Sequence, residues 1–154
     1  MQQFEAQVEW RRGKQAFADN RYSRAHQWQF DGGLTVPASS SPLSVPAPMS
    51  DPGAVDPEEA LVAAVSSCHM LFFLSIAARR GFVVDSYSDK PVGTMDRNAD
   101  GKMAMTLFTL RPVVAFDGER QPGSADLDAL HHEAHEHCYI ANSIKADVVI
   151  EGAS

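Results

Sequence analysis

Residues 56–81, DPEEALVAAVSSCHMLFFLSIAARRG, predict one long helix around which the rest of the fold is arranged. Asp56 suits the N-cap position, Pro57 suits the first helical position, and two carboxylates follow in the first turn, where the helix dipole favours negative charge. The closing Arg79-Arg80-Gly81 is typical of a helix end. Residues between these ends are apolar on almost every side, which indicates a central, buried helix.

Strand patterns flank this helix in the chain. The strands expected before it are FEAQVEW (4–10), SRAHQWQF (23–30) and LTVPAS (34–39), followed by a loop rich in Ser and Pro. The elements expected after it are strands over 82–95 and 102–116, a helix from Ser124 to about Tyr139, and a strand over 143–151. The order β-β-β-α-β-β-α-β predicts one α+β domain over residues 1–154, with a mostly antiparallel sheet.

A helix that is apolar on every side needs apolar cover on every side. One sheet from a chain of 154 residues can cover only one face of the helix. We therefore predict a homodimer in which two central helices lie between two sheets.

Composition limits the classes of partner. The formal net charge of −7 argues against nucleic acid, because binding to phosphates needs a basic surface. The sequence has no uninterrupted run of about 18 apolar residues, so no membrane span is predicted. The N-terminus MQQFEAQVEW lacks the basic and then apolar segments of a signal peptide, so a cytoplasmic location is expected.

The chain has two cysteines, Cys68 and Cys138, which in such a compartment are either two buried thiols or a redox pair. Cys68 lies several turns inside its helix, where the helix dipole no longer acts on it. A reactive Cys68 therefore needs a cation from elsewhere. Arg21 and Arg24 are the candidates, and Glu58 could hold such an arginine by a bidentate contact.

A metal site is an alternative use of the second cysteine. His131, His135 and Cys138 are spaced i, i+4 and i+7, so they fall near one face of a helix and could bind zinc with an open fourth position. One helix rarely supplies every ligand, however, and His69 is the one other histidine near a cysteine. An exposed, His-rich polar helix face explains the same pattern.

Asp56-Pro57-Glu58-Glu59-Ala60-Leu61, followed by Ser66-Ser67-Cys68, resembles the Pro-Glu-Glu-Leu…Cys helix of the OsmC/Ohr family, the osmotically induced and organic hydroperoxide resistance proteins. The segment from Ala134 to Ser143, around Cys138, resembles the end of that family's second cysteine-bearing helix. The order of the elements also agrees, so the resemblance extends over essentially the whole chain.

The resemblance implies an intertwined homodimer and a thiol peroxidase without a cofactor. It implies that Cys68 attacks the hydroperoxide and that Cys138 resolves the sulfenic acid as a disulfide. Glu58 and an arginine would arrange the site. A dithiol donor, either a lipoylated or a thioredoxin-like protein, would then reduce the disulfide. The apolar residues that follow Cys68 favour an organic hydroperoxide over hydrogen peroxide.

The sequence departs from the family in two respects. The arginine of OsmC-type members would fall at Ser39-Ser40-Ser41, whereas that of Ohr-type members falls near Arg21 or Arg24; we prefer Arg24 because it opens the stretch RAHQWQF. Histidines are also unusually frequent near both cysteines, including His69 and the cluster over 131–137, which indicates a divergent branch. A small-ligand-binding module that keeps the fold without the catalysis is the remaining alternative.

Overall fold

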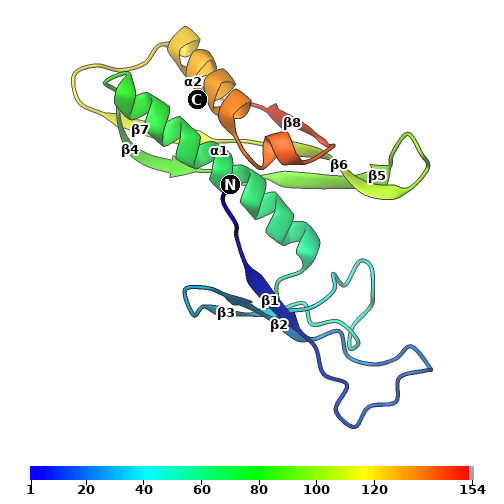
Figure 1. The fold of residues 1–154 in the computed structure, drawn as a ribbon. Helices are drawn as coiled ribbons and strands as arrows, with labels where there is room; N and C mark the ends of the chain where they lie inside the picture. The colour runs from blue at the N-terminus through cyan, green and yellow to red at the C-terminus, as the bar shows by residue number, and fades with distance from the viewer. Residues whose placement is uncertain (153–154) are drawn as a thin grey trace. The chain divides into compact units, whose positions relative to one another are not determined.

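The computed structural model describes residues 1–152, and the chain divides into two compact units, Met1–Ala60 and Leu61 onward (Figure 1). The elements are β1 (Ala6–Glu9), β2 (His26–Phe30), β3 (Thr35–Ala38), α1 (Pro57–Arg79), β4 (Val83–Ser88), β5 (Val92–Arg97), β6 (Met103–Leu110), β7 (Val113–Asp117), α2 (Ser124–His137), the 3-10 turn η1 (Ala141–Ser143) and β8 (Asp147–Ile150). Two helices with mostly antiparallel sheets confirm the α+β class.

The first unit is built on the antiparallel sheet β1-β2-β3. The turn between β2 and β3 closes where the Phe30 N–H donates to the Leu34 carbonyl at 2.9 Å. Gly33 permits this turn because it adopts a positive φ of 87°. The loop that follows β3 returns to the sheet, since the Ser39 N–H donates to the Val55 carbonyl at 3.0 Å. The expected irregular loop is therefore held by its own hydrogen bonds.

Both ends of α1 follow from local sequence, as expected. The Asp56 carboxylate accepts from the Glu59 N–H at 2.8 Å, and the Glu59 carboxylate accepts from the Asp56 N–H at 2.9 Å, which makes a reciprocal capping box. At the other end Gly81 has a positive φ of 80°, and the Phe82 N–H donates to the Ala77 carbonyl. The capping residues therefore set the length of the helix.

The second unit has two apolar cores that share α1. The first core joins α1 and α2 to the two-stranded sheet β4-β7, and its buried residues are Phe73, Ile76, Ala77, Phe82, Val114, Leu130 and Ala134. The second core places Val65 of α1 against Phe108 and Leu110 of β6, in the sheet β5-β6-β8. Helix α1 therefore packs on both sheets of this unit, along different parts of its length.

Each of the two long strands expected after α1 is in fact two strands that belong to different sheets. The first divides at Asp89-Lys90-Pro91 and the second at Arg111-Pro112, so the order β-β-β-α-β-β-α-β has two strands too few. Proline interrupts a strand because it has no N–H to donate. The Asp89 carboxylate joins the two breaks, since it accepts from the Arg111 N–H at 2.7 Å and from the Ser66 hydroxyl at 2.5 Å.

Helix α1 is less covered within one chain than its composition suggests. A stripe of α1 is exposed, with Ala63, Ser67, Leu71, Ser75 and Ala78 along it. By length and composition alone, the helix is also long and apolar enough to cross a membrane. Core helices of soluble proteins meet the same criteria. Because its opposite face is part of two packed cores, we interpret α1 as a core helix.

Candidate functional site

The two thiols come together in the second unit. Cys68 lies near the middle of α1, and Cys138 is the residue that ends α2. Both cysteines are free, and Cys68 is close enough to the Cys138 thiol to raise its pKa. The structure therefore pairs two residues that are far apart in the sequence, as a redox pair requires.

The two thiols differ in exposure and in acidity. Cys68 is partly exposed, whereas Cys138 is only 1% exposed. Burial, and to a lesser extent the neighbouring Cys68, raises the pKa of the Cys138 thiol to about 11, although the Ala141 N–H, which donates to Sγ at 3.4 Å, acts in the opposite direction. Cys138 is therefore a protonated, shielded thiol at neutral pH, while Cys68 is the thiol that a reagent can reach.

Aromatic side chains stand beside this pair of thiols. Phe72 lies one helical turn after Cys68, and Tyr139 directly follows Cys138. Their rings meet edge to face, with centroids 4.9 Å apart. Tyr139 is 72% exposed, so this aromatic contact lies at the surface, between residues that are near the two cysteines in the sequence.

Two histidines, one from each of the helices that carry the cysteines, form a buried pair. His69 follows Cys68, and its Nε2 lies 3.0 Å from Nδ1 of His131 on α2. The rings are nearly parallel, at 5°, and the side chains are 1% and 4% exposed. Burial, followed by the charges of His131 and His135, lowers the pKa of His69 to about 4, and burial also lowers the pKa of His131. Both imidazoles are neutral at physiological pH.

The structure does not support the metal hypothesis. Within residues 1–152, no three His, Cys, Asp or Glu side chains gather in a way that could hold a metal ion. His131, one of the three ligands in this hypothesis, is directed at His69. Its ring also packs against the Phe73 ring, with the two centroids 4.4 Å apart. The i, i+4, i+7 spacing aligns residues on one helix but does not bring three donor atoms to a common point.

Glu58 and Arg24, the other two predicted site residues, belong to the first unit. Glu58 lies in the first turn of α1, and its Oε2 is buried without a hydrogen-bond partner among the described residues. The Arg24 guanidinium stacks on the Tyr22 ring, 3.9 Å from the centroid, and donates to the carbonyl and side-chain oxygens of Asn20. Arg21 is exposed. Of the four predicted residues, the structure brings together the two cysteines.

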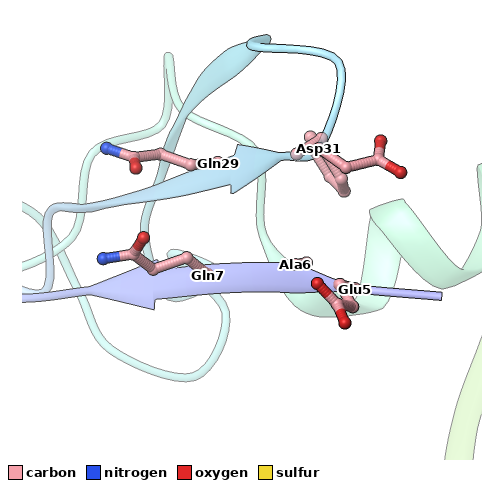
Figure 2. A pocket seen from close by; sticks show the side chains of 6 residues that line it. Glu5, Ala6, Gln7, Gln29 and Asp31 are labelled. Atoms are coloured by element: carbon pink, nitrogen blue, oxygen red, sulfur yellow. The ribbon is translucent and has the colours of Figure 1, made fainter. Parts of the chain in front are cut away.

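A hollow in the first unit lies at the ends of β1 and β2, and Figure 2 shows side chains that border it. Its lining residues are Glu5, Ala6, Gln7, Gln29, Phe30 and Asp31. The lining includes no thiol and no imidazole, so none of the predicted site residues borders this hollow.

The histidine pair is the part of the site that the sequence reasoning missed. The sequence places His69 next to Cys68 and makes His131 a candidate metal ligand, but it does not show that the two histidines contact each other. The signal was the position of His131 between Leu130 and Ala134, on the buried face of α2. A histidine on an apolar helix face needs a polar partner from the element that packs against it.

The fold and the thiol pair define a class of α+β proteins in which two helices bring one cysteine each to a common site. Residues 50–152 match the family model described as OsmC-like protein. The chain belongs to the OsmC-like family, as the motif around Cys68 predicted.

Solved structures agree with this assignment. An OsmC-like protein of unknown function from Vibrio cholerae is 52% identical; the match covers 98% of this chain and 99% of that chain, with a TM-score of 0.96. The organic hydroperoxide resistance protein OsmC of Legionella pneumophila is 16% identical over 97% and 94% of the two chains, with a TM-score of 0.69. The organic hydroperoxide resistance protein OhrB of Bacillus subtilis is 17% identical over 96% and 95% of the two chains, with a TM-score of 0.62. A comparison with curated protein sequences gave no match.

Proposed function

We propose that this protein is a thiol peroxidase that reduces organic hydroperoxides through Cys68 and Cys138. The observation that carries the proposal is the unequal pair of thiols: Cys68 is partly exposed, and Cys138 is buried beside it with a pKa of about 11. A peroxidase needs one thiol that meets the substrate and a second that stays protected until the first is oxidised. Two relatives with this fold carry organic hydroperoxide resistance in their names.

In the first step the thiolate sulfur of Cys68 attacks the terminal oxygen of the hydroperoxide. The O–O bond breaks, the alkoxide takes up a proton and leaves as an alcohol, and Cys68 becomes a sulfenic acid. In the second step the Cys138 sulfur loses its proton and attacks the Cys68 sulfur. The hydroxyl group leaves as water, and the two cysteines form a disulfide.

Arg24 and Glu58 are proposed to complete the site. The Arg24 guanidinium would stabilise the Cys68 thiolate and the charge that develops as the O–O bond breaks. Glu58 supports this arrangement because its buried Oε2 has an unused acceptor position that suits a guanidinium. We also propose that residues 1–154 form one OsmC-like domain, because the match to the Vibrio cholerae protein covers 98% of this chain.

The aromatic side chains near the two cysteines favour hydroperoxides that carry an apolar group. Phe72, one helical turn after Cys68, and Tyr139, next to Cys138, form an aromatic contact at the surface. Contact with such side chains stabilises a bound alkyl or aryl group but not hydrogen peroxide. The Cys68–Cys138 disulfide must then be reduced by a dithiol donor in the cytoplasm, a lipoylated or thioredoxin-like protein.

We further propose that the protein is an intertwined homodimer. The exposed stripe of α1 contains Leu71, and in the first unit Phe4, Val8 and Leu34 are 91%, 67% and 62% exposed. The alternation of residues 4–10 predicts a half-buried strand face, which one chain leaves uncovered. A second copy would cover both surfaces. Light scattering is expected to give twice the mass of one chain, and a monomer at micromolar concentration would contradict the proposal.

The experiment that tests the function is oxidation of the reduced protein with one equivalent of cumene hydroperoxide. Intact mass spectrometry is expected to show the loss of two hydrogen atoms, and peptide mapping a Cys68–Cys138 disulfide. The matched control is the same amount of hydrogen peroxide, which is expected to react more slowly because it has no apolar group. A protein that keeps both thiols after exposure to cumene hydroperoxide is not a peroxidase, and a ligand-binding role would become the better hypothesis.

A further inference from the structure

The helices that carry the thiols are joined by one buried hydrogen bond. His69 of α1 and His131 of α2 share it, at 3.0 Å between Nε2 and Nδ1. The other hydrogen bonds between the two helices in the described part of the chain link Arg79 and Arg80 to Glu133, and they are exposed. Exposed ion pairs constrain geometry weakly, because water competes for both partners. The histidine pair is therefore the directional contact between α1 and α2.

The orientation of both rings is restricted by packing. The His69 and His131 rings are nearly parallel with centroids 5.3 Å apart, and the centroids of the Phe73 and His131 rings are 4.4 Å apart. Each residue also has one buried ring nitrogen without a partner among the described residues, Nδ1 of His69 and Nε2 of His131. Burying two imidazoles in this way costs more free energy than burying apolar side chains of similar size. What the pair adds in return is a fixed direction and distance between the helices.

That distance matters for the cysteines. Cys68 precedes His69 on α1, and Cys138 lies two helical turns beyond His131 on α2. A shift of either helix that breaks the 3.0 Å contact also moves one thiol relative to the other. A disulfide forms only when its two Cβ atoms are about 3.5–4.5 Å apart, so small displacements are costly.

We propose that His69 and His131 are a positioning pair whose hydrogen bond holds α1 and α2 at the spacing that the Cys68–Cys138 disulfide requires. The inference rests on the proposed redox use of the two thiols. The histidines touch neither substrate nor sulfur in this role; they act through the register of the two helices. An apolar pair would fill the space without setting that register.

Two substitutions at one position separate hydrogen bonding from packing. The glutamine amide of His69→Gln places its nitrogen where Nε2 stands and can still bond Nδ1 of His131. The shorter amide of His69→Asn has the same polarity but cannot reach. Glu133→Gln removes the exposed ion pairs between the same helices and serves as the control for general loosening.

The measurement is the equilibrium between the protein and dithiothreitol at neutral pH, which does not depend on peroxide chemistry. The protein dithiol and oxidised dithiothreitol exchange two electrons and two protons to give the protein disulfide and reduced dithiothreitol. We expect His69→Asn to lower the equilibrium constant about tenfold, the effect of one lost buried hydrogen bond. His69→Gln and Glu133→Gln are expected to stay within about twofold of the wild type.

Three results would overturn the inference. One is a constant for His69→Asn that equals that of the wild type, and another is an equal fall in His69→Asn and Glu133→Gln. The third is a wild-type protein that forms no disulfide with oxidised dithiothreitol, which would also remove the proposed function. A disulfide that forms with oxidised dithiothreitol but not with cumene hydroperoxide contradicts only the proposed peroxidase activity. The equilibrium constants of the variants then still decide whether the histidine pair positions the two cysteines.

Discussion

Replacing Cys68 with serine is expected to lower the rate of cumene hydroperoxide reduction by at least about 10³-fold, because a hydroxyl group is a far weaker nucleophile than a thiolate. Serine preserves the size and polarity of the side chain, so the packing of α1 is retained. The rate would be measured by the loss of hydroperoxide with excess dithiothreitol as the reductant. Circular dichroism would confirm that the variant is folded.

Cys138→Ser is the matched control for this prediction. It removes the resolving thiol but leaves Cys68 in place, so one equivalent of hydroperoxide is still consumed and Cys68 accumulates as a sulfenic acid that a dimedone-type reagent traps. The two variants therefore differ in the first turnover, although both lack the disulfide. Retained activity in Cys68→Ser would refute the assigned roles, and retained activity in Cys68→Ser together with loss of the first turnover in Cys138→Ser would reverse them.

Acid is expected to destabilise the protein because the buried histidine pair must remain neutral. The pKa of His69 falls from 6.5 to about 4 on folding, so between these values the unfolded chain binds more protons than the folded one. The free energy of unfolding therefore has its full value, with respect to His69, above about pH 6.5, and it decreases as the pH falls towards 4. Its size for His69, which is 1% exposed, is roughly 3 kcal/mol. Urea unfolding across this pH range would measure it.

Other groups around the pair modify this dependence. His135 on α2 disfavours the charge on His69, whereas the carboxylates of Asp128 on α2 and Asp89 after β4 favour a charge on His131. Tyr87 on β4 also packs on Phe73, but it stays neutral because burial raises its pKa. The variant His69→Gln keeps the hydrogen bond without the titration, so its stability is expected to fall less between pH 6.5 and 4. Parallel curves for the two proteins would contradict the assignment to His69.

The boundaries of α1 were predictable because their signals are local. Asp56 and Glu59 cap the helix through residues only three positions apart, and Gly81 closes it with a positive φ that needs no distant partner. The strand breaks at Pro91 and Pro112 were missed although proline is also a local signal. Long alternating patterns on both sides outweighed it, and the Asp89 contacts that stabilise both breaks join segments more than 20 residues apart.

The sequence by itself determined the family, the α+β class and the ends of α1, because each of these depends on motifs of neighbouring residues. Only the tertiary structure decided that Cys138 is buried while Cys68 is partly exposed, and that the side chains of His69 and His131 meet. Exposure, pKa and side-chain pairing arise from contacts between elements far apart in the chain. The direction in which two packed helices present their residues to each other is not encoded in the spacing of either helix alone.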